Sequence, residues 1–325
     1  MPANLTPQYL EAEKNFRMAK TPLEKIAALE EMLAVMPKHK GTDHLRADLR
    51  TRIAKLTQSL DKKTATQRAS MMIEKVGAGQ VAVIGLPNTG KSQIVVSITK
   101  AAPTVAAYPF TTQSATPGMM TYENIQIQLI DTPPLSEQPP EWWLLNIIRR
   151  ADGLLVVVDL SDDPVFQLEM VVIQLEERKI GLGEGRTDTQ SEVPLTYKRT
   201  LVAGNKTDLD DNGANLQALK EKCGDRLPIV PISALGEGLD DLRLRIFQML
   251  DILRVYTKTP GGKPDMTDPI ILDRGSTLEA AAASVHKDFA RKMKYARIWG
   301  SGKHDGVMAK RDHVLQDGDI IELHM

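Results

Sequence analysis

The 325-residue chain is nearly without cysteine, and its one thiol is Cys223. A lone cysteine excludes a disulfide within the chain and is typical of proteins kept in a reducing compartment. The six histidines are scattered, and no cysteine or histidine pair has the spacing of zinc ligands. We therefore expect no structural zinc site.

Long hydrophobic runs are missing as well. No stretch approaches the roughly 20 apolar residues that span a bilayer, and the first residues, MPANLTPQYLEAEKN, lack the basic and apolar regions of a signal peptide. The formal net charge of −1 argues against a protein that coats nucleic acid along its whole surface. These absences predict a cytoplasmic protein that does not use a membrane.

The most informative segment that is present is GLPNTGKS, Gly85 to Ser92. It matches the phosphate-loop pattern G-x-x-x-x-G-K-S and lies between a predicted strand, GQVAVI, and a predicted helix, QIVVSITK. Backbone N–H groups and a helix N-terminus then converge on one anion. We expect Lys91 to reach the β and γ phosphates of a nucleotide and the Ser92 hydroxyl to ligate magnesium. A glycine-containing turn that merely resembles the motif is the alternative.

Three further motifs follow predicted strands in a fixed order. Asp131 in DTPP follows NIQIQLI, NKTD (Asn205 to Asp208) follows TLVAG, and SAL (Ser233 to Leu235) follows PIVPI. Ligands bind at the carboxyl ends of strands in open α/β sheets, so Asp131 is expected in the magnesium shell. The Asp208 carboxylate can accept hydrogen bonds from guanine N1–H and its exocyclic amine, a donor pair that adenine lacks. Asn205 and Lys206 are expected to brace the loop and cover the ring, and the N–H near Ala234 to meet the base oxygen.

With these motifs, the chain resembles the Obg-like family of translation-factor-related GTPases. The segment YPFTT, Tyr108 to Thr112, resembles the first switch of that family, and the residues from Met266 onward resemble a TGS domain, most clearly in HKDF, KYARIWG and DHVLQDGDIIEL. The pairing resembles the developmentally regulated GTP-binding protein branch. The resemblance implies a GTPase that hydrolyses GTP to GDP and phosphate, with Thr112, or otherwise Thr111, ligating magnesium.

The expected fold is therefore α/β: a doubly wound, mostly parallel P-loop GTPase sheet with an N-terminal helical hairpin and a C-terminal ubiquitin-like (β-grasp) TGS domain. We place the helical region at 1–78, the G domain at 79–257, a linker at 258–265 because TKTPGGKPD is rich in proline and glycine, and the TGS domain at 266–325. The helix before the linker is predicted over DDLRLRIFQMLDILRVY. Binding of GTP or GDP is assigned to Gly85, Pro87, Asn88, Thr89, Gly90, Lys91, Ser92, Gln93, Asn205, Lys206, Asp208, Ser233, Ala234 and Leu235.

Two positions depart from the usual GTPase pattern. Most relatives have glycine where this chain has Pro134, which has no N–H to offer the γ phosphate. Many small GTPases place a water-orienting glutamine where this chain has Leu135, a hydrophobic replacement that is typical of the Obg-like family. The resemblance implies that Asn88 coordinates potassium and so contributes to catalysis with Lys91 and Thr112. The alternative is that Asn88 only shapes the loop.

Basic residues are concentrated in two places. Apolar side chains at helical spacing (Leu23, Ile26, Leu29, Leu33, Met36 and Leu45, Leu49, Ile53, Leu56, Leu60) predict an antiparallel hairpin after the TPLE capping box. The hairpin carries Lys38, Lys40, Arg46, Arg50, Arg52, Lys55, Lys62, Lys63 and Arg68. The C-terminal module carries Lys287, Arg291, Lys292, Lys294, Arg297, Lys303, Lys310 and Arg311 around Tyr295 and Trp299. Either region can be a solvated face, with Trp299 in the core, or a contact for RNA or the ribosome.

Three hypotheses remain open from the sequence. The first is a slow GTPase switch that engages RNA or the ribosome, and it leads. The second is a nucleotide-binding scaffold that barely hydrolyses GTP, because of Pro134. The third is an RNA-binding or small-nucleotide-sensing module. We also allow for a stabilising partner protein. Of the adjacent Trp142 and Trp143, we expect at most one to face the core squarely.

Overall fold

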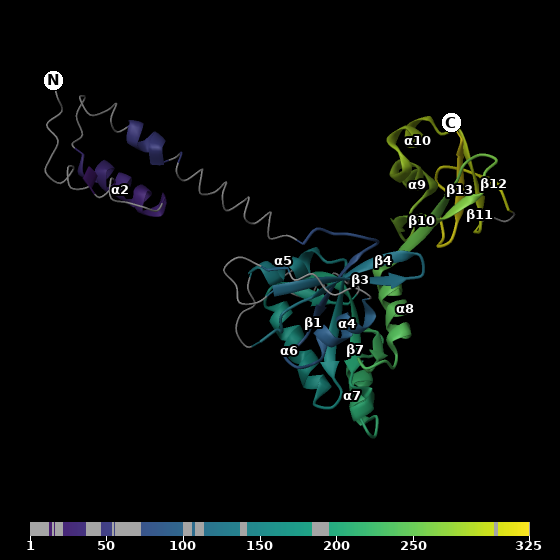
Figure 1. The fold of residues 1–325 in the computed structure, drawn as a ribbon, viewed down its shortest axis with the longest axis horizontal. Helices are drawn as coiled ribbons and strands as arrows, with labels where there is room; N and C mark the ends of the chain where they lie inside the picture. Colours follow the sequence, from purple (N-terminus) through teal and green to yellow (C-terminus); the bar gives the residue numbers. More distant parts are fainter. Residues whose placement is uncertain are drawn as a thin grey trace. The chain divides into compact units, whose positions relative to one another are not determined.

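The structure is a computed structural model that describes residues 13–14, 16, 22–36, 47–53, 55, 73–99, 106–107, 114–136, 142–183, 195–301 and 305–324. The chain divides into two compact units, Met1–Met72 and Ile73–Met325, and each is described by itself (Figure 1). Among the described residues, no helix has both the length and the apolar character that a membrane crossing requires.

The N-terminal unit contains the predicted pair of apolar stripes. Helix α2, Pro22–Val35, begins at the predicted proline, and residues 47–53 are helical again. Leu29 and Met36 are buried against Leu49, with Ile53 packed beside them. This confirms that the two stripes share one small core. The expected contributions of Leu45, Leu56 and Leu60, and the capping residue Thr21, lie outside the described residues.

The second unit begins with the sheet that carries the motifs. Its strand order is β2-β3-β4-β1-β5-β7-β6, and β8 pairs with β7. Pairing is parallel throughout except at β2–β3 and β3–β4, which are antiparallel. The strands are β1 Gln80–Ile84, β2 Ala106–Ala107, β3 Ser114–Tyr122, β4 Ile125–Asp131, β5 Gly153–Asp159, β6 Ile180–Leu182, β7 Thr196–Asn205 and β8 Ile229–Pro231. The expected mostly parallel sheet is confirmed.

Burial explains why the central strands are continuous apolar runs. Every residue of β1 and β5 is buried, because helices cover both faces of a doubly wound sheet and leave no side for polar residues (Figure 1). Helix α4 packs with α8, and α6 packs with α7. The helices are α4 Lys91–Ile98, α5 Trp142–Arg150, α6 Pro164–Glu176, α7 Ala214–Cys223 and α8 Leu239–Leu250. In α5, Trp143 is buried and Trp142 is 51% exposed, as the helical spacing predicts.

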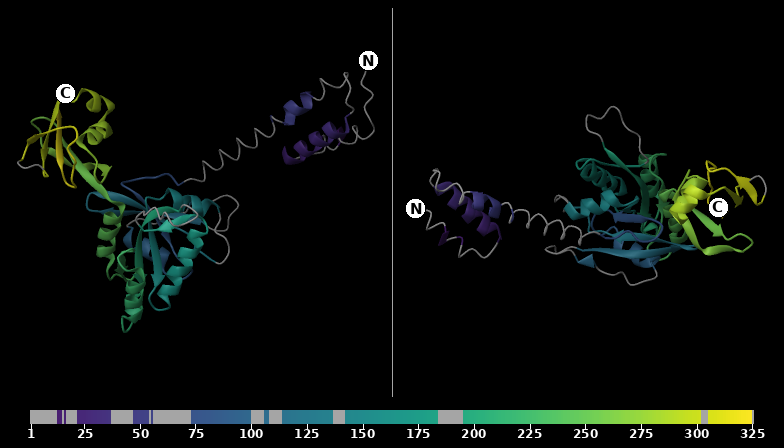
Figure 2. Two further views of the ribbon diagram at one scale, coloured as in Figure 1. Left: turned by 180° about the vertical axis from the view of Figure 1, so that it is seen from behind. Right: turned by 90° about the horizontal axis from the view of Figure 1, so that it is seen from above.

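A second sheet, of order β10-β9-β13-β11-β12, forms the C-terminal module. Its elements are β9 Ile252–Lys258, β10 Pro264–Asp273, α9 Leu278–Val285, α10 Lys287–Lys292, β11 Tyr295–Trp299, β12 Val307–Ala309 and β13 Ile320–His324. Helices α9 and α10 lie on one face of the sheet (Figures 1 and 2). Leu278 and Ala282 of α9 pack there against Val255, Ile298 and Ile321.

The prediction of a linker at 258–265, and of one helix over DDLRLRIFQMLDILRVY before it, is wrong. Helix α8 ends at Leu250, Asp251 takes a left-handed conformation (φ 53°), and β9 starts at Ile252. Strand β9 pairs antiparallel with β10 and parallel with β13, so residues 253–257 belong to the C-terminal sheet and 258–265 contain the β9–β10 turn. The proline and glycine that suggested a linker serve this turn, because a hairpin needs the same residue types.

Candidate nucleotide site

The phosphate loop joins β1 to α4, as the motif predicts. Gly90 has φ 89°, and a Cβ there would overlap Nδ2 of Asn205, so only glycine fits this close approach. Asn88 also takes a left-handed conformation, with φ 64°. Thr89 is buried, and its hydroxyl donates to the Leu86 carbonyl at 3.2 Å. The phosphate loop is thus closed by a side-chain hydrogen bond to its own backbone carbonyl at Leu86.

Lys91 and Asp131 are two charged side chains of the site that lie close enough to affect each other's pKa. The Lys91 ammonium donates to the Leu86 carbonyl at 2.6 Å. Burial lowers the pKa of Lys91 to about 8, and the charge of Asp131 limits the fall. Burial raises the pKa of the Asp131 carboxyl, against a hydrogen bond with Ser92 and the charge of Lys91. The Oδ1 atom of Asp131 is buried without a hydrogen-bond partner among the described residues. A carboxylate oxygen left over beside a serine hydroxyl fits a hard cation such as Mg²⁺.

Asn205 connects the phosphate loop to the base-side loop. Its side chain is buried at the end of β7, its Nδ2 donates to the Thr89 carbonyl at 2.9 Å, and its Oδ1 accepts from the Ala234 N–H at 3.0 Å. The bracing role predicted for Asn205 is therefore present in the geometry. The nitrogen and the oxygen of this one amide bond to different loops, so Asn205 links the two loops directly.

The same contact revises the expectation for Ala234. An N–H near Ala234 was expected to meet the base oxygen, and the N–H of Ala234 itself already donates to Asn205. The Leu235 N–H lies 3.3 Å from the Ser233 hydroxyl, and the Leu235 side chain is 85% exposed. Asp208 is exposed on the short 3₁₀ helix Thr207–Leu209 that follows β7. The base side of the site is thus open at Asp208 and Leu235.

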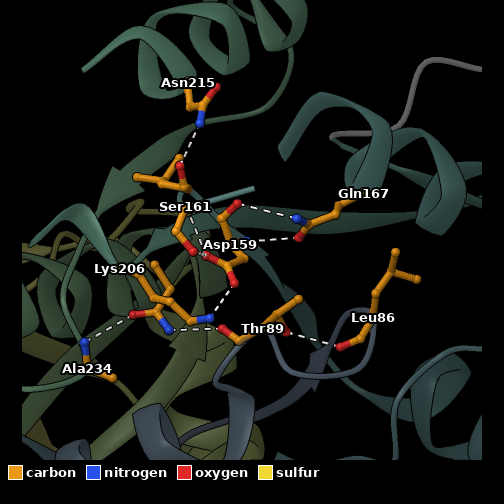
Figure 3. A network of polar contacts seen from close by, with 10 residues as sticks. Leu86, Thr89, Asp159, Ser161, Gln167, Lys206, Asn215 and Ala234 are labelled. Carbon is orange, nitrogen blue, oxygen red and sulfur yellow. Dashed lines mark hydrogen bonds and ion pairs between the residues drawn. The ribbon is translucent and has the colours of Figure 1, made fainter. Parts of the chain in front are cut away.

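Asp159 is a residue of the site that the sequence reasoning missed. It ends β5, and its carboxylate forms an ion pair with Lys206, whose φ is 65° (Figure 3). Its Oδ1 accepts from the N–H and hydroxyl of Ser161, at 2.9 and 2.6 Å. Although burial acts to raise it, these hydrogen bonds and the one from Lys206 hold the pKa of Asp159 below its ordinary value. The available signal was its place at the carboxyl end of a buried strand.

Gln167 fixes the backbone at the same point. Its Oε1 accepts from the Asp159 N–H at 2.8 Å, and its Nε2 donates to the Asp159 carbonyl at 3.3 Å (Figure 3). Gln167 therefore holds the Asp159 backbone, while the Asp159 carboxylate contacts Ser161 and Lys206. The predicted bracing role of Lys206 depends on this buried acid.

The segment after β4 is anchored to the phosphate loop by backbone. Pro134 is exposed, while Leu135 is buried and its N–H donates to the Gly85 carbonyl at 3.0 Å. Leu135 also lines a hollow of about 620 Å³ together with Pro87 and Phe166. The first N–H after the proline is thus bonded to the loop itself.

Of the remaining predicted residues, the structure describes Gln93 and Ser233 but not Thr111 and Thr112. Gln93 lies on α4 with its Nε2 3.5 Å from the Ser97 hydroxyl, and Ser233 is buried after β8. Thr111 and Thr112, the candidates for the first switch, lie outside the described residues. Strands β1, β4, β7 and β8 run in the same direction. The phosphate loop, Asp131, NKTD and SAL come at the ends of these strands and so meet at one edge of the sheet, as their order in the sequence predicts.

Comparison with known proteins agrees with this geometry. A family described as "50S ribosome-binding GTPase" matches residues 80–183, and the TGS domain matches 253–325. An uncharacterized GTP-binding protein of Methanocaldococcus jannaschii is 31% identical over 92% of each chain. The developmentally-regulated GTP-binding protein 2 homolog of Dictyostelium discoideum is 28% identical over 93% of this chain and 98% of its own. The crystal structure of a GTP-binding protein from Pyrococcus horikoshii OT3, 16% identical with a TM-score of 0.53, covers 75% of this chain and 99% of its own and shares the fold.

Proposed function

Because the chain belongs to the developmentally regulated GTP-binding protein branch of the Obg-like GTPases, we propose that it is a slow, potassium-stimulated GTPase that engages RNA or the ribosome. One observation carries the nucleotide part of this proposal. Asn205 ties Thr89 of the phosphate loop to Ala234 of the base-side loop, as a site for a whole nucleotide requires. Family membership and this geometry together make the protein a GTP-binding protein.

Each of these groups at the carboxyl edge of the first sheet has a proposed role in binding the nucleotide. Lys91 neutralises the β and γ phosphates, and its hydrogen bond to Leu86 keeps the ammonium at the loop before the nucleotide arrives. Asp208 accepts the two guanine donors, and Lys206, held by Asp159, covers the ring. To reach the base oxygen, the Ala234 N–H must leave Asn205 at 3.0 Å, whereas the Leu235 N–H leaves only the longer contact to Ser233 at 3.3 Å, so Leu235 is the better donor.

Magnesium fits the residues beside the phosphates. The unpartnered Oδ1 of Asp131 and its neighbour Ser92 supply oxygen ligands, and the family resemblance adds Thr112. The ion would neutralise charge on the γ phosphate.

Potassium is the proposed replacement for an arginine finger, and Asn88 is its proposed ligand. Because Asn88 has φ 64°, replacement by alanine adds about 1 kcal/mol of backbone strain, whereas glycine removes the amide without that strain. Asn88→Gly therefore tests the amide, and Asn88→Ala tests amide and loop shape together.

The experiment measures phosphate release under saturating GTP in potassium or sodium chloride at equal ionic strength. Potassium is expected to raise turnover about tenfold in the unchanged protein, which corresponds to about 1.4 kcal/mol of barrier. Both Asn88 variants should lose this difference, and only Asn88→Ala should bind GDP more weakly. Equal rates in both salts would refute the potassium proposal, and a response retained by Asn88→Gly would assign Asn88 to loop shape alone.

A scaffold with little hydrolysis is the second candidate, and Pro134 favours it. Proline has no N–H for the γ phosphate, and the next N–H, from Leu135, is already bonded to Gly85. Pro134→Gly restores the missing donor. If single-turnover hydrolysis by the unchanged protein is no faster than GTP decay in buffer, and Pro134→Gly accelerates it, the scaffold replaces the switch.

Engagement of RNA or the ribosome is supported by charge. Arg50, Arg52 and Lys55 are exposed in the N-terminal unit, where Arg52 pairs with Asp48 at 2.9 Å. The matching GTPase family is described by ribosome binding. Sedimentation with ribosomal subunits, in GDP and in a non-hydrolysable GTP analogue, tests ribosome binding, and the absence of co-sedimentation in both states would reject it.

A further inference from the structure

The C-terminal sheet has a face opposite α9 and α10 that carries aromatic and charged side chains. Its β9 side is covered, because Ile252 packs with Phe247 and Leu250 of α8. We call the part formed by β11, β12 and β13 the outer face, and no helix of the described residues lies over it (Figure 2). Ala296 and Ile298 of β11 point into the core, so Tyr295, Arg297 and Trp299 alternate to the outer face. In the β11–β13 register these three lie opposite His324, Glu322 and Ile320. The expectation that Trp299 sits in the core is wrong, because the strand alternation places it on the other side.

Tyr295 and His324 form a stacked pair on the outer face. Their ring centroids are 4.4 Å apart at an interplanar angle of 14°. His324 Nε2 lies 2.6 Å from Glu322, which fixes the ring in place. A ring held by a second ring and by a carboxylate loses little freedom when a further flat group stacks on the pair.

The ring of Trp299 is already in contact with other residues, so it does not offer a free face for stacking as the Tyr295–His324 pair does. The Lys258 ammonium lies 4.1 Å from its ring centroid, and a Cβ at Gly306 would come within 3.2 Å of the ring. Lys258 also pairs with Glu322 at 3.4 Å. The Glu322 carboxylate is therefore paired with Lys258 and in contact with the His324 ring, and Trp299 closes one end of the surface.

The cations around the stacked pair have no such partners. Arg297 is exposed beside it, across the strand from the exposed Met308. Lys294 is exposed next to Tyr295, and its backbone N–H donates to the His324 carbonyl at 2.8 Å. No carboxylate of the described residues forms a salt bridge with either of these two cations, so both are available to an anionic chain.

We propose that the outer face binds single-stranded RNA, with an unpaired base stacked on the Tyr295–His324 pair and the flanking phosphates at Arg297 and Lys294. The proposal rests on the proposed function, since it assigns a surface to the RNA engagement stated there. Stacking on a ring combined with phosphate contacts is how sequence-tolerant single-strand sites work. Unstacked bases distinguish this ligand from duplex RNA, which offers only its backbone and minor groove.

The test measures binding of the full chain, loaded with GDP, to a fluorescent single-stranded RNA of about a dozen nucleotides. Tyr295→Leu keeps an apolar side chain but removes the ring, and it should weaken binding roughly 5- to 100-fold. Tyr295→Phe should bind as the unchanged protein does. Arg297→Gln should reduce the slope of log affinity against log salt by about 1. Lys220→Gln, on the exposed side of α7, is the matched control and should change neither.

A second RNA of equal length that lacks its bases separates stacking from charge. The unchanged protein should bind it more weakly than the normal strand, and Tyr295→Leu should cause no further loss. Hydrogen exchange of β11 and β13 amides checks that the variant sheet is intact. If Tyr295→Leu binds the normal strand as tightly as the unchanged protein, the outer face is not the site, although RNA engagement stands. If the unchanged protein binds neither this RNA nor ribosomal subunits, both proposals fail.

Discussion

Arg254 should be the residue that holds the C-terminal module to the turn between β3 and β4. Its guanidinium donates to both oxygens of Asp317, at 3.0 and 2.7 Å, and also to Glu123. Its side chain is 10% exposed, and its Cζ lies 5.0 Å from the ring centroid of Phe247. We predict that Asp317→Asn destabilises the C-terminal sheet clearly more than Glu123→Gln does.

Exposure sets the two magnitudes. Removing one partner of a fully buried ion pair costs about 3–5 kcal/mol, and Asp317 is 33% exposed, so about 2 kcal/mol is expected for Asp317→Asn. Glu123 is 58% exposed, and pairs of that kind contribute about 1 kcal/mol or less. The Arg254 N–H also donates to Asp317, at 2.7 Å, so the aspartate supports both backbone and guanidinium.

The cost should depend on pH in a defined direction. Although burial acts to raise it, hydrogen bonds from Arg254 hold the pKa of Asp317 below its ordinary value of 3.8. A carboxyl with a lowered folded-state pKa contributes its full stability above the unfolded-state pKa and loses it as pH falls through the folded-state pKa. The difference between Asp317→Asn and the unchanged protein should therefore be full at neutral pH and shrink below about pH 4.

Hydrogen exchange is the appropriate assay, because a chain with several modules does not unfold in a single two-state step. The opening free energies of β9 and β13 amides are measured in the unchanged protein, Asp317→Asn, Glu123→Gln and the control Asp305→Asn, which replaces an exposed acid of the same module. Glu123→Gln costing as much as Asp317→Asn, or Asp317→Asn matching the control, would refute the reasoning.

Three other predictions concern the nucleotide. Asp208→Asn should shift preference from GTP to XTP, because the amide pairs with xanthine; calorimetry showing that the unchanged protein binds ATP as tightly as GTP would disprove the base assignment. GDP binding at pH 8 should take up about half a proton, since Lys91 has a pKa of about 8 before phosphate recharges it. Calorimetry in buffers of different ionisation enthalpy measures this uptake, which Lys91→Met should abolish. Gly90→Ala should weaken GDP binding about tenfold or more, because its Cβ displaces Asn205; unchanged affinity would show that the brace is dispensable.

The motif loops were accessible from the sequence because their requirements are local. The GLPNTGKS segment demands glycine where the backbone approaches other groups, as at Gly90, and the apolar runs before Asp131 and Asn205 read as buried strands. A strand that ends at a polar motif places that motif at the carboxyl edge of a parallel sheet. The arrangement of the four loops thus followed from residue order alone.

Contacts between residues distant in sequence decided the rest. The segment 252–258 continues the apolar spacing of α8, and only its pairing with β10 and β13 makes it a strand. Asp159 became part of the site through Lys206, and the Ala234 N–H was taken by Asn205. The ring of Tyr295 faces outward because Ala296 and Ile298 fill the core. Strand pairing and the partners of buried polar groups depend on contacts across the whole chain. Local spacing therefore determined where the motifs lie, while tertiary contacts determined which side chains support them.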